Sequence, residues 1–238
     1  MPQNISTYFL VLAVCLILTI PLEFVFGLNV IRKPSYFLKA VWLPATVYIV
    51  WDIFATANSH WAFTDKHVSN IKLLDLPIEE YLFFLVIPLC SVLTYEAVKK
   101  VFPSLSFHTK YFYFFLCAYL ILGIAIQTIW SLQTETAQPD RISPYYTLIT
   151  VLAVALFSYY WLRKNYHKEH LSYMLLSLAI CLVFMVFING FLTKLTDPVV
   201  TYSANIGPRL FIDIPVEDFF YGSVLILWTL CRYKNAQK

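Results

Sequence analysis

Charged residues are scarce in this sequence. Asp, Glu, Lys and Arg together make up 13% of its 238 residues, whereas a soluble domain carries about 25%. A chain with so few charges cannot cover a water-exposed surface, so most of its surface must face lipid. The net charge of +3 does not indicate a nucleic-acid partner.

Glycines and paired cysteines are also scarce, and each absence argues against a class of protein. With five glycines and no Gly-x-Gly-x-x-Gly pattern, the chain lacks a dinucleotide-binding fold, so we expect no flavin or other cofactor. The five cysteines include no Cys-x-x-Cys pair, and no carboxylate cluster accompanies His167 and His170. We therefore expect no metal site.

Hydrophobic residues dominate what is present, at 60% of the chain, and 18% of the residues are aromatic. A helix that spans a membrane needs about 20 mostly apolar residues. Seven segments meet or approach that length. We predict an all-α polytopic membrane protein with about seven transmembrane helices, near residues 6–27, 37–57, 76–98, 110–131, 144–163, 171–192 and 212–231.

The distribution of positive charge predicts how the chain is oriented. If the N-terminus is outside, twelve of the 17 Lys and Arg residues lie in the inner loops and tail, and five lie in the outer loops. Cytoplasmic loops of membrane proteins carry an excess of Lys and Arg. We therefore expect a protein of the cell membrane with its N-terminus outside and its C-terminus in the cytoplasm.

The chain contains an internal repeat. Residues 73–84 read LLDLPIEEYLFF, and residues 211–222 read FIDIPVEDFFYG. At an offset of 138, Asp75, Pro77 and Glu79 match Asp213, Pro215 and Glu217, and Glu80 corresponds to Asp218. Parallel repeats are an established pattern in membrane proteins. We predict two parallel three-helix repeats, residues 1–105 and 136–238, joined by a linker helix within residues 106–135.

Each repeated motif places acids at the start of a helix. The Asp before the Pro is a candidate N-cap, and the two acids after the Pro point about 100° apart. Acids at the start of a helix are stabilised by the helix dipole, so they need not have another function. Ionisable groups in membrane segments are costly, however, and are by default a sign of function. We predict Glu79 and Glu217 as the central catalytic acids, with Glu80, Asp218 and Asp52 as partners; acid and base roles stay open.

Polar and aromatic residues near these acids are candidate contacts for a substrate. Asn189 holds about the same place on the sixth span as Asp52 on the second. Glu23 lies nearer the inner side, as an interfacial residue or a deeper member of the site. Aromatic faces stabilise cations, although any one of these rings also suits a membrane-interface belt. The candidates are Asn189, Glu23, Trp51, Trp61, Phe83, Phe84, Phe220 and Tyr221.

The duplicated Pro-x-Glu-Glu/Asp motifs followed by aromatic residues resemble the small membrane-embedded lycopene cyclase family, in the form that fuses two half-size chains. The sequence PLEF at residues 21–24 and the stretch from Trp51 to Trp61 are similar to that family as well. The resemblance implies an isomerase (an intramolecular lyase) that cyclises the linear ends of lycopene to β-ionone rings. γ-Carotene and then β-carotene would form without redox change. It implies a lipophilic carotenoid substrate in the bilayer; a homo-oligomer, or contact with other carotenoid enzymes, stays open.

Several alternatives stay open at this point. Within the family, the substrate could be a longer prenylated carotenoid, or the product an ε-ring. A small seven-helix transporter is a rival of another class, against which the aromatic content and the single level of the acids argue. A non-catalytic structural subunit is a third. A retinal protein is disfavoured because no lysine lies between Ile212 and Cys231.

Overall fold

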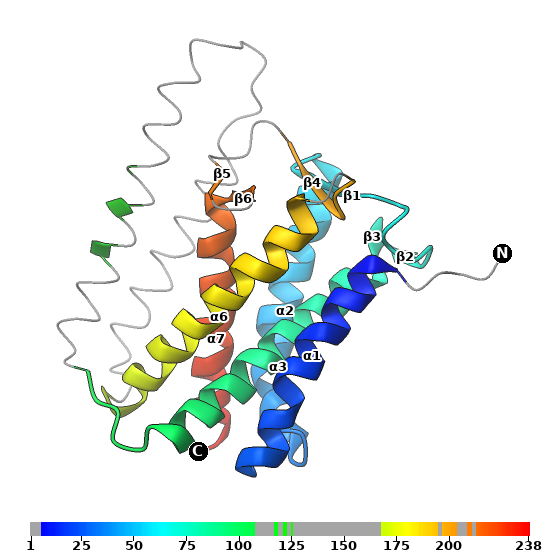
Figure 1. Cartoon of the computed structure of the whole chain (residues 1–238). Helices are drawn as coiled ribbons and strands as arrows, with labels where there is room; N and C mark the ends of the chain where they lie inside the picture. The colour runs from blue at the N-terminus through cyan, green and yellow to red at the C-terminus, as the bar shows by residue number, and fades with distance from the viewer. Residues whose placement is uncertain are drawn as a thin grey trace.

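Five long helices form the body of the protein in a computed structural model that describes residues 6–107, 117–118, 121–122, 125, 168–194, 197–203, 209–210 and 213–238. The predicted span at 144–163 lies outside the described residues, and so does nearly all of the span at 110–131. The helices are α1 (Thr7–Phe26), α2 (Pro34–Ala57), α3 (Ile78–Val101), α6 (Lys168–Lys194) and α7 (Val216–Ala236) (Figure 1).

Within the described part of the chain, four helices are long and apolar enough to cross a membrane. They are α1, α2, α3 and the stretch His170–Thr193 of α6. Helix α7 is not among them; it begins with Glu217 and Asp218 and ends near Arg232 and Lys234. A helical membrane protein is thus confirmed, whereas the count of seven spans is not.

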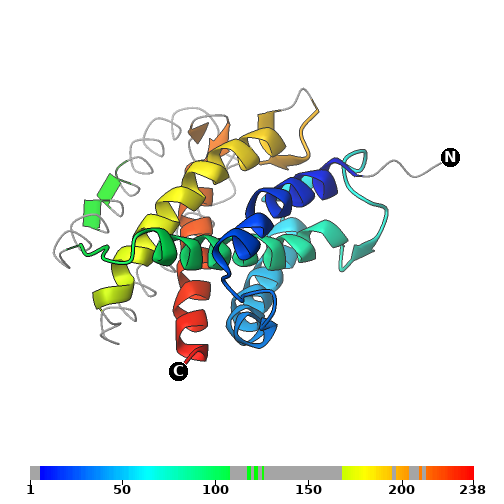
Figure 2. The same cartoon turned by 60° about the horizontal axis from the view of Figure 1, so that its bottom comes forward.

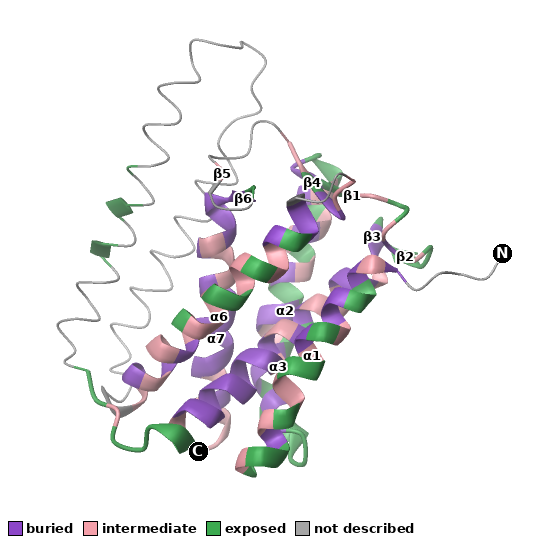
Figure 3. Ribbon diagram, in the orientation of Figure 1, coloured by how far each residue is buried: buried purple, intermediate pink, exposed green. Residues whose placement is uncertain are grey.

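Helix α3 is the centre of the arrangement. It packs against each of the other four helices, and α2 packs against α7 (Figure 2). In the internal repeat, α2 and α3 correspond to α6 and α7, so the contact between α2 and α7 has its counterpart in that between α6 and α3. Figure 3 shows α3 largely buried and exposed positions along α1 and α6. Among the exposed apolar residues of these two helices are Ile17 and Phe187. Those exposed faces suit contact with lipid.

The short strands at one end of the helices were not predicted (Figure 1). Strand β1 (Trp61–Phe63) pairs with β4 (Val200–Tyr202), which joins the two halves of the chain. Strands β2 (Lys72–Leu73) and β3 (Leu76–Pro77) form a hairpin before α3, and β5 (Arg209–Leu210) and β6 (Ile214–Pro215) form the matching hairpin before α7. The all-α prediction therefore omits three two-stranded antiparallel sheets among the described residues.

The two hairpins begin α3 and α7 in the same way. Pro77 and Pro215 occupy the N-cap positions with extended backbones. Asp75 and Asp213 lie in the hairpin turns with left-handed φ angles of 64° and 59°, a conformation that Asp tolerates because its short side chain can bond locally. The predicted N-cap role of these Asp residues is therefore wrong, because each belongs to a turn that precedes the cap.

The pairing of β1 with β4 predicts an engineered cross-link. Ala62 and Thr201 are directly opposite in the register, and both are exposed. Opposed residues of an antiparallel pair have Cα atoms about 4.5–5.5 Å apart, within the range of a disulfide. We expect the double variant Ala62→Cys/Thr201→Cys to form this disulfide under mild oxidation, detected as a cross-linked peptide by mass spectrometry. Each single variant is the control, and a double variant without that peptide would contradict the pairing.

Candidate functional site

A largely apolar pocket lies between the two halves of the chain. Residues from α1, α2, α3, α6, α7, β1 and β4 line it, and its volume is ≈ 160 Å³. For comparison, an apolar protein cavity of about 150 Å³ binds benzene. The space in this pocket therefore corresponds to about one six-membered carbon ring.

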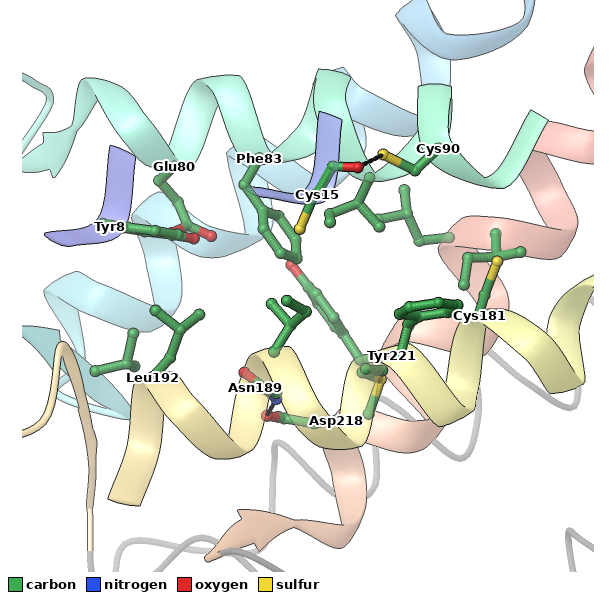
Figure 4. A pocket seen from close by; sticks show the side chains of 18 of the residues that line it. Tyr8, Cys15, Glu80, Phe83, Cys90, Cys181, Asn189, Leu192, Asp218 and Tyr221 are labelled. Atoms are coloured by element: carbon green, nitrogen blue, oxygen red, sulfur yellow. Dashed lines mark hydrogen bonds between the residues drawn. The ribbon is translucent and has the colours of Figure 1, made fainter. Parts of the chain in front are cut away.

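The polar groups of the pocket form two clusters that come from different elements. Figure 4 shows Tyr8 and Glu80 on the side of α1 and α3, and Asn189 and Asp218 on the side of α6 and α7. Asp52 of α2 also lines the pocket. One motif acid of each repeat, Glu80 and Asp218, thus lies in the same cavity, at the place where the two halves join.

The first cluster is a pair of acids. Glu80 accepts a hydrogen bond of 2.6 Å from the Tyr8 hydroxyl, and Asp52 accepts one of 2.6 Å from Nε1 of Trp61. The carboxyl groups of Asp52 and Glu80 also hydrogen-bond to each other. Since an ionised carboxylate only accepts hydrogen bonds, a bond between two carboxyl groups requires a proton on one of them. The two carboxyl groups are thus placed so that they could share one proton at the pocket wall.

The second cluster holds a single acid between two donors. Asp218 accepts a hydrogen bond of 2.7 Å from Nδ2 of Asn189 and one of 2.6 Å from the Tyr202 hydroxyl. Tyr202 lies on β4, outside the spanning helices, and burial together with the charge of Asp218 raises its pKa well above the usual range. Tyr202 therefore keeps the proton that it donates. Asn189 and Asp52 were predicted to hold equivalent places in the two repeats. Their contacts agree with this, because Asn189 contacts Asp218 as Asp52 contacts Glu80.

The other acids of the two motifs do not line the pocket. Glu79 is fully buried and accepts hydrogen bonds from the hydroxyl of Ser6 and from the N–H (2.7 Å) and hydroxyl (3.0 Å) of Ser69. Glu217 is 1% exposed and is likewise not part of the pocket wall. The pocket wall thus contains Glu80 and Asp218, whereas the catalytic role of Glu79 and Glu217 stays a prediction. Adjacent helix positions point about 100° apart, and the pattern alone did not tell which of each pair faces the pocket.

The predicted aromatic contacts divide into two groups. Trp61, Phe83 and Tyr221 line the pocket, whereas Trp51, Phe84 and Phe220 do not. Within the second group, Trp51 stacks on His60 with ring centroids 6.3 Å apart, Phe84 packs against Tyr48 at 5.8 Å, and Phe220 is buried. These three rings are therefore not part of the pocket wall.

Glu23 does not line the pocket and lies near the C-terminal end of α1. Its carboxylate accepts hydrogen bonds from the backbone N–H groups of Val30 (3.0 Å) and Ile31 (3.2 Å). It is buried and fixes the turn between α1 and α2. Of the two interpretations of Glu23 in the sequence, a role at the helix end fits the structure, and a place in the substrate pocket does not.

Two tyrosines of the site were missed by the sequence analysis. Tyr8 follows the N-cap of α1, and Tyr202 lies on a short strand that was not predicted. Their separation from the motifs by about 70 and 16 residues, respectively, hides the contact. The sequence held only a weak indication of these two tyrosines. Tyr8 lies near the start of the first predicted span, and Tyr202 lies between the sixth and the seventh, both on the side where the motif helices begin.

A helical membrane protein with paired acids on the wall of an apolar, aromatic pocket is suited to acid chemistry on a lipophilic molecule. Comparison with known families agrees: the sequence model described as lycopene cyclase matches residues 5–98 and 143–235. These two segments cover most of the chain and coincide with its two repeats, and the chain belongs to the lycopene cyclase family. Neither the curated proteins nor the solved structures contain a match to it.

The different environments of Glu79 and Glu80 predict different effects of the same substitution. Glu79→Gln leaves one acceptor oxygen where Glu79 has two, which weakens the hydrogen bonds from Ser6 and Ser69 at a cost of about 1–3 kcal/mol. Glu80→Gln keeps a partner for Tyr8 and for Asp52. We expect a lower thermal unfolding midpoint in detergent for Glu79→Gln than for Glu80→Gln, measured by tryptophan fluorescence. Equal midpoints would contradict these placements.

Proposed function

We propose that this chain cyclises the linear ends of lycopene to β-ionone rings, giving γ-carotene and then β-carotene. The observation that carries the proposal is the contact between the carboxyl groups of Asp52 and Glu80 on the wall of an apolar pocket the size of one ring. The reaction is a net isomerisation, since each proton gained by the substrate is matched by one lost.

The first step is transfer of a proton from the acid pair to the terminal double bond of the substrate. One C–H bond forms, and a tertiary cation results. The neighbouring double bond attacks that cation, which forms the C–C bond of the ring and moves the positive charge into the ring. A base then removes a ring proton, and its C–H electrons form the ring double bond. These steps need a donor, a base and a pocket that excludes water.

The aromatic wall suits the cationic stage of this reaction. Trp61 lies edge-on to Tyr221, with centroids 6.5 Å apart, and edge-on to Tyr202 at 6.2 Å. All three rings line the pocket, together with Phe83. Ring faces attract positive charge, and they offer no strong nucleophile that would trap the cation. This supports a carbocation pathway in preference to hydration of the double bond.

The size and opening of the pocket favour treatment of one end of the substrate at a time. The volume corresponds to one ring, so the rest of a long polyene must extend outside. Leu18 of α1 and Phe184 of α6 line the pocket and are about half exposed, at 52% and 48%. Because these two helices expose apolar faces, the opening between them leads toward lipid. A carotenoid dissolved in the bilayer would enter there with one end.

The pocket argues against the transporter alternative. A transport path for a polar solute needs a hydrated channel, whereas the wall here is mainly hydrophobic and its polar groups bond to one another. Ring type and substrate length rest on the family resemblance, so an ε-ring product or a longer prenylated carotenoid are outcomes of the test below. We further propose the cell membrane as location, with the N-terminus outside, from the distribution of Lys and Arg.

Expression in a bacterial host that accumulates lycopene tests the proposal. We expect conversion to γ- and β-carotene, separated by chromatography, and a fall of about 10² or more in conversion for Glu80→Gln, because a general acid contributes that much. Glu96→Gln is the matched control: Glu96 is a buried acid on the same helix but bonds to Lys99 and Gln237, away from the pocket. Normal conversion by Glu80→Gln would contradict the proposed donor.

Unchanged lycopene with the protein present in the membrane would contradict lycopene as substrate. A longer carotenoid with prenylated ends would then be supplied to the same cells. A lack of cyclisation there as well would remove the enzyme proposal altogether.

A further inference from the structure

We infer that the two halves of the chain have different chemical roles, with the Asp52–Glu80 pair as proton donor and the Asp218 carboxylate as the base that removes the ring proton. The inference rests on the proposed cyclisation and deepens it, because the repeated motifs by themselves assign neither role. It comes from a difference between the two clusters at one pair of equivalent positions.

Asp52 and Asn189 are those equivalent positions. Asp52 of α2 bonds to Glu80 of α3, and Asn189 of α6 bonds to Asp218 of α7, so each pair joins corresponding helices of the repeat. The first pair contains two carboxyl groups, and the second contains one carboxyl group and one amide. Asp and Asn have nearly the same shape, so the halves differ here in proton content more than in geometry.

The partners of Asp52 require a proton within the first cluster. Oδ1 of Asp52 accepts from the indole N–H of Trp61. Oδ2 is buried, and no N–H or O–H group of the described residues reaches it. The hydrogen-bonding neighbour of this carboxyl group is the carboxyl of Glu80. Burying that contact without a shared proton would leave two repelling carboxylates, which is strongly unfavourable.

The partners of Asp218 favour the opposite state. Both the Asn189 amide and the Tyr202 hydroxyl donate to its carboxylate, and its Oδ2 atom accepts both bonds. Hydrogen bonds donated to the charged form stabilise that form. Tyr202 itself holds its proton firmly, because burial and the neighbouring carboxylate raise its pKa. Asp218 therefore faces the pocket as an ionised group that is able to accept a proton.

The proton balance of one cyclisation closes within these residues. The acid pair loses one proton to the substrate carbon, and Asp218 gains one from the ring carbon. Between turnovers Asp218 releases its proton to water and the pair takes one up from water, which restores the starting state, so no oxidant or reductant is needed. Both clusters lie on the wall of one pocket (Figure 4), which is what a donor and a base acting on the same ring require.

Infrared spectroscopy of the purified protein tests the location of the proton without any substrate. A protonated carboxylic acid has its own C=O stretching band, which shifts on exchange into D₂O. We expect such a band in the unmodified protein, its loss in Asp52→Asn and in Glu80→Gln, and its retention in Asp218→Asn. Loss in Asp218→Asn, or retention in both of the other variants, would overturn the inference.

Asn189→Asp supplies a second test by gain of signal. It would turn the second cluster into a pair of carboxyl groups like the first, so we expect an additional protonated-acid band. No additional band would overturn the inference. Since this variant gains a feature, misfolding cannot imitate the expected result, and gel filtration confirms that each variant remains a folded, monodisperse protein.

The products made by the same variants separate the two roles. In the lycopene-accumulating host, we expect Asp52→Asn to leave the substrate uncyclised, with conversion reduced by about 10² or more. We expect Asp218→Asn to give a larger share of rings whose double bond lies elsewhere, because the cation forms but loses a different proton. The reverse pattern would overturn the inference. Expected infrared bands without any cyclisation would instead contradict the proposed function and leave the proton location standing.

Discussion

The burial of carboxyl groups in an apolar helical body is the constraint that organises this protein. A charged group taken out of water must be paired or hydrogen-bonded. Three buried acids among the described residues illustrate different ways of satisfying this requirement. Glu23 binds backbone N–H groups, Glu79 binds two serines, and Glu96 binds Lys99. These contacts tie α1 to the turn before α2, the start of α3 to the start of α1 and to Ser69, and α3 to itself. Among the acids of the pocket, Asp52 contacts Glu80, and Asp218 accepts hydrogen bonds from Asn189 and Tyr202.

This constraint also explains how far the sequence could predict the site. The repeat located the acids, and the spacing of Asp52 and Asn189 placed them at the same level. The choice between Glu79 and Glu80 depends on the rotation of α3, which is set by packing against α1 and by the hairpin turn at Asp75. Those are long-range contacts and a local turn, and neither leaves a periodic pattern in the sequence. Tyr8 and Tyr202 were missed for the same reason.

The fold was predictable to the extent that it depends on apolar length. The ranges expected for α1, α2, α3 and α6 agree with the structure to within a few residues, because long apolar runs define them. The strands were missed because each has only two or three residues, too few for an alternating pattern, and because β1 and β4 pair across the two halves. The division of the chain at residues 106 and 136 stays a prediction, since those positions lie in or next to segments outside the described residues.

Duplication of one helical unit places two acid motifs in a single pocket, and a single difference between Asp52 and Asn189 gives them different proton content. The most direct test is to let the purified protein cyclise lycopene in D₂O and to measure the deuterium content of the product by mass spectrometry. Transfer of an exchangeable proton from the acid pair predicts one carbon-bound deuterium for each ring formed. Rings that contain no deuterium would show that cyclisation does not begin with an acidic proton of the protein, and would contradict the account.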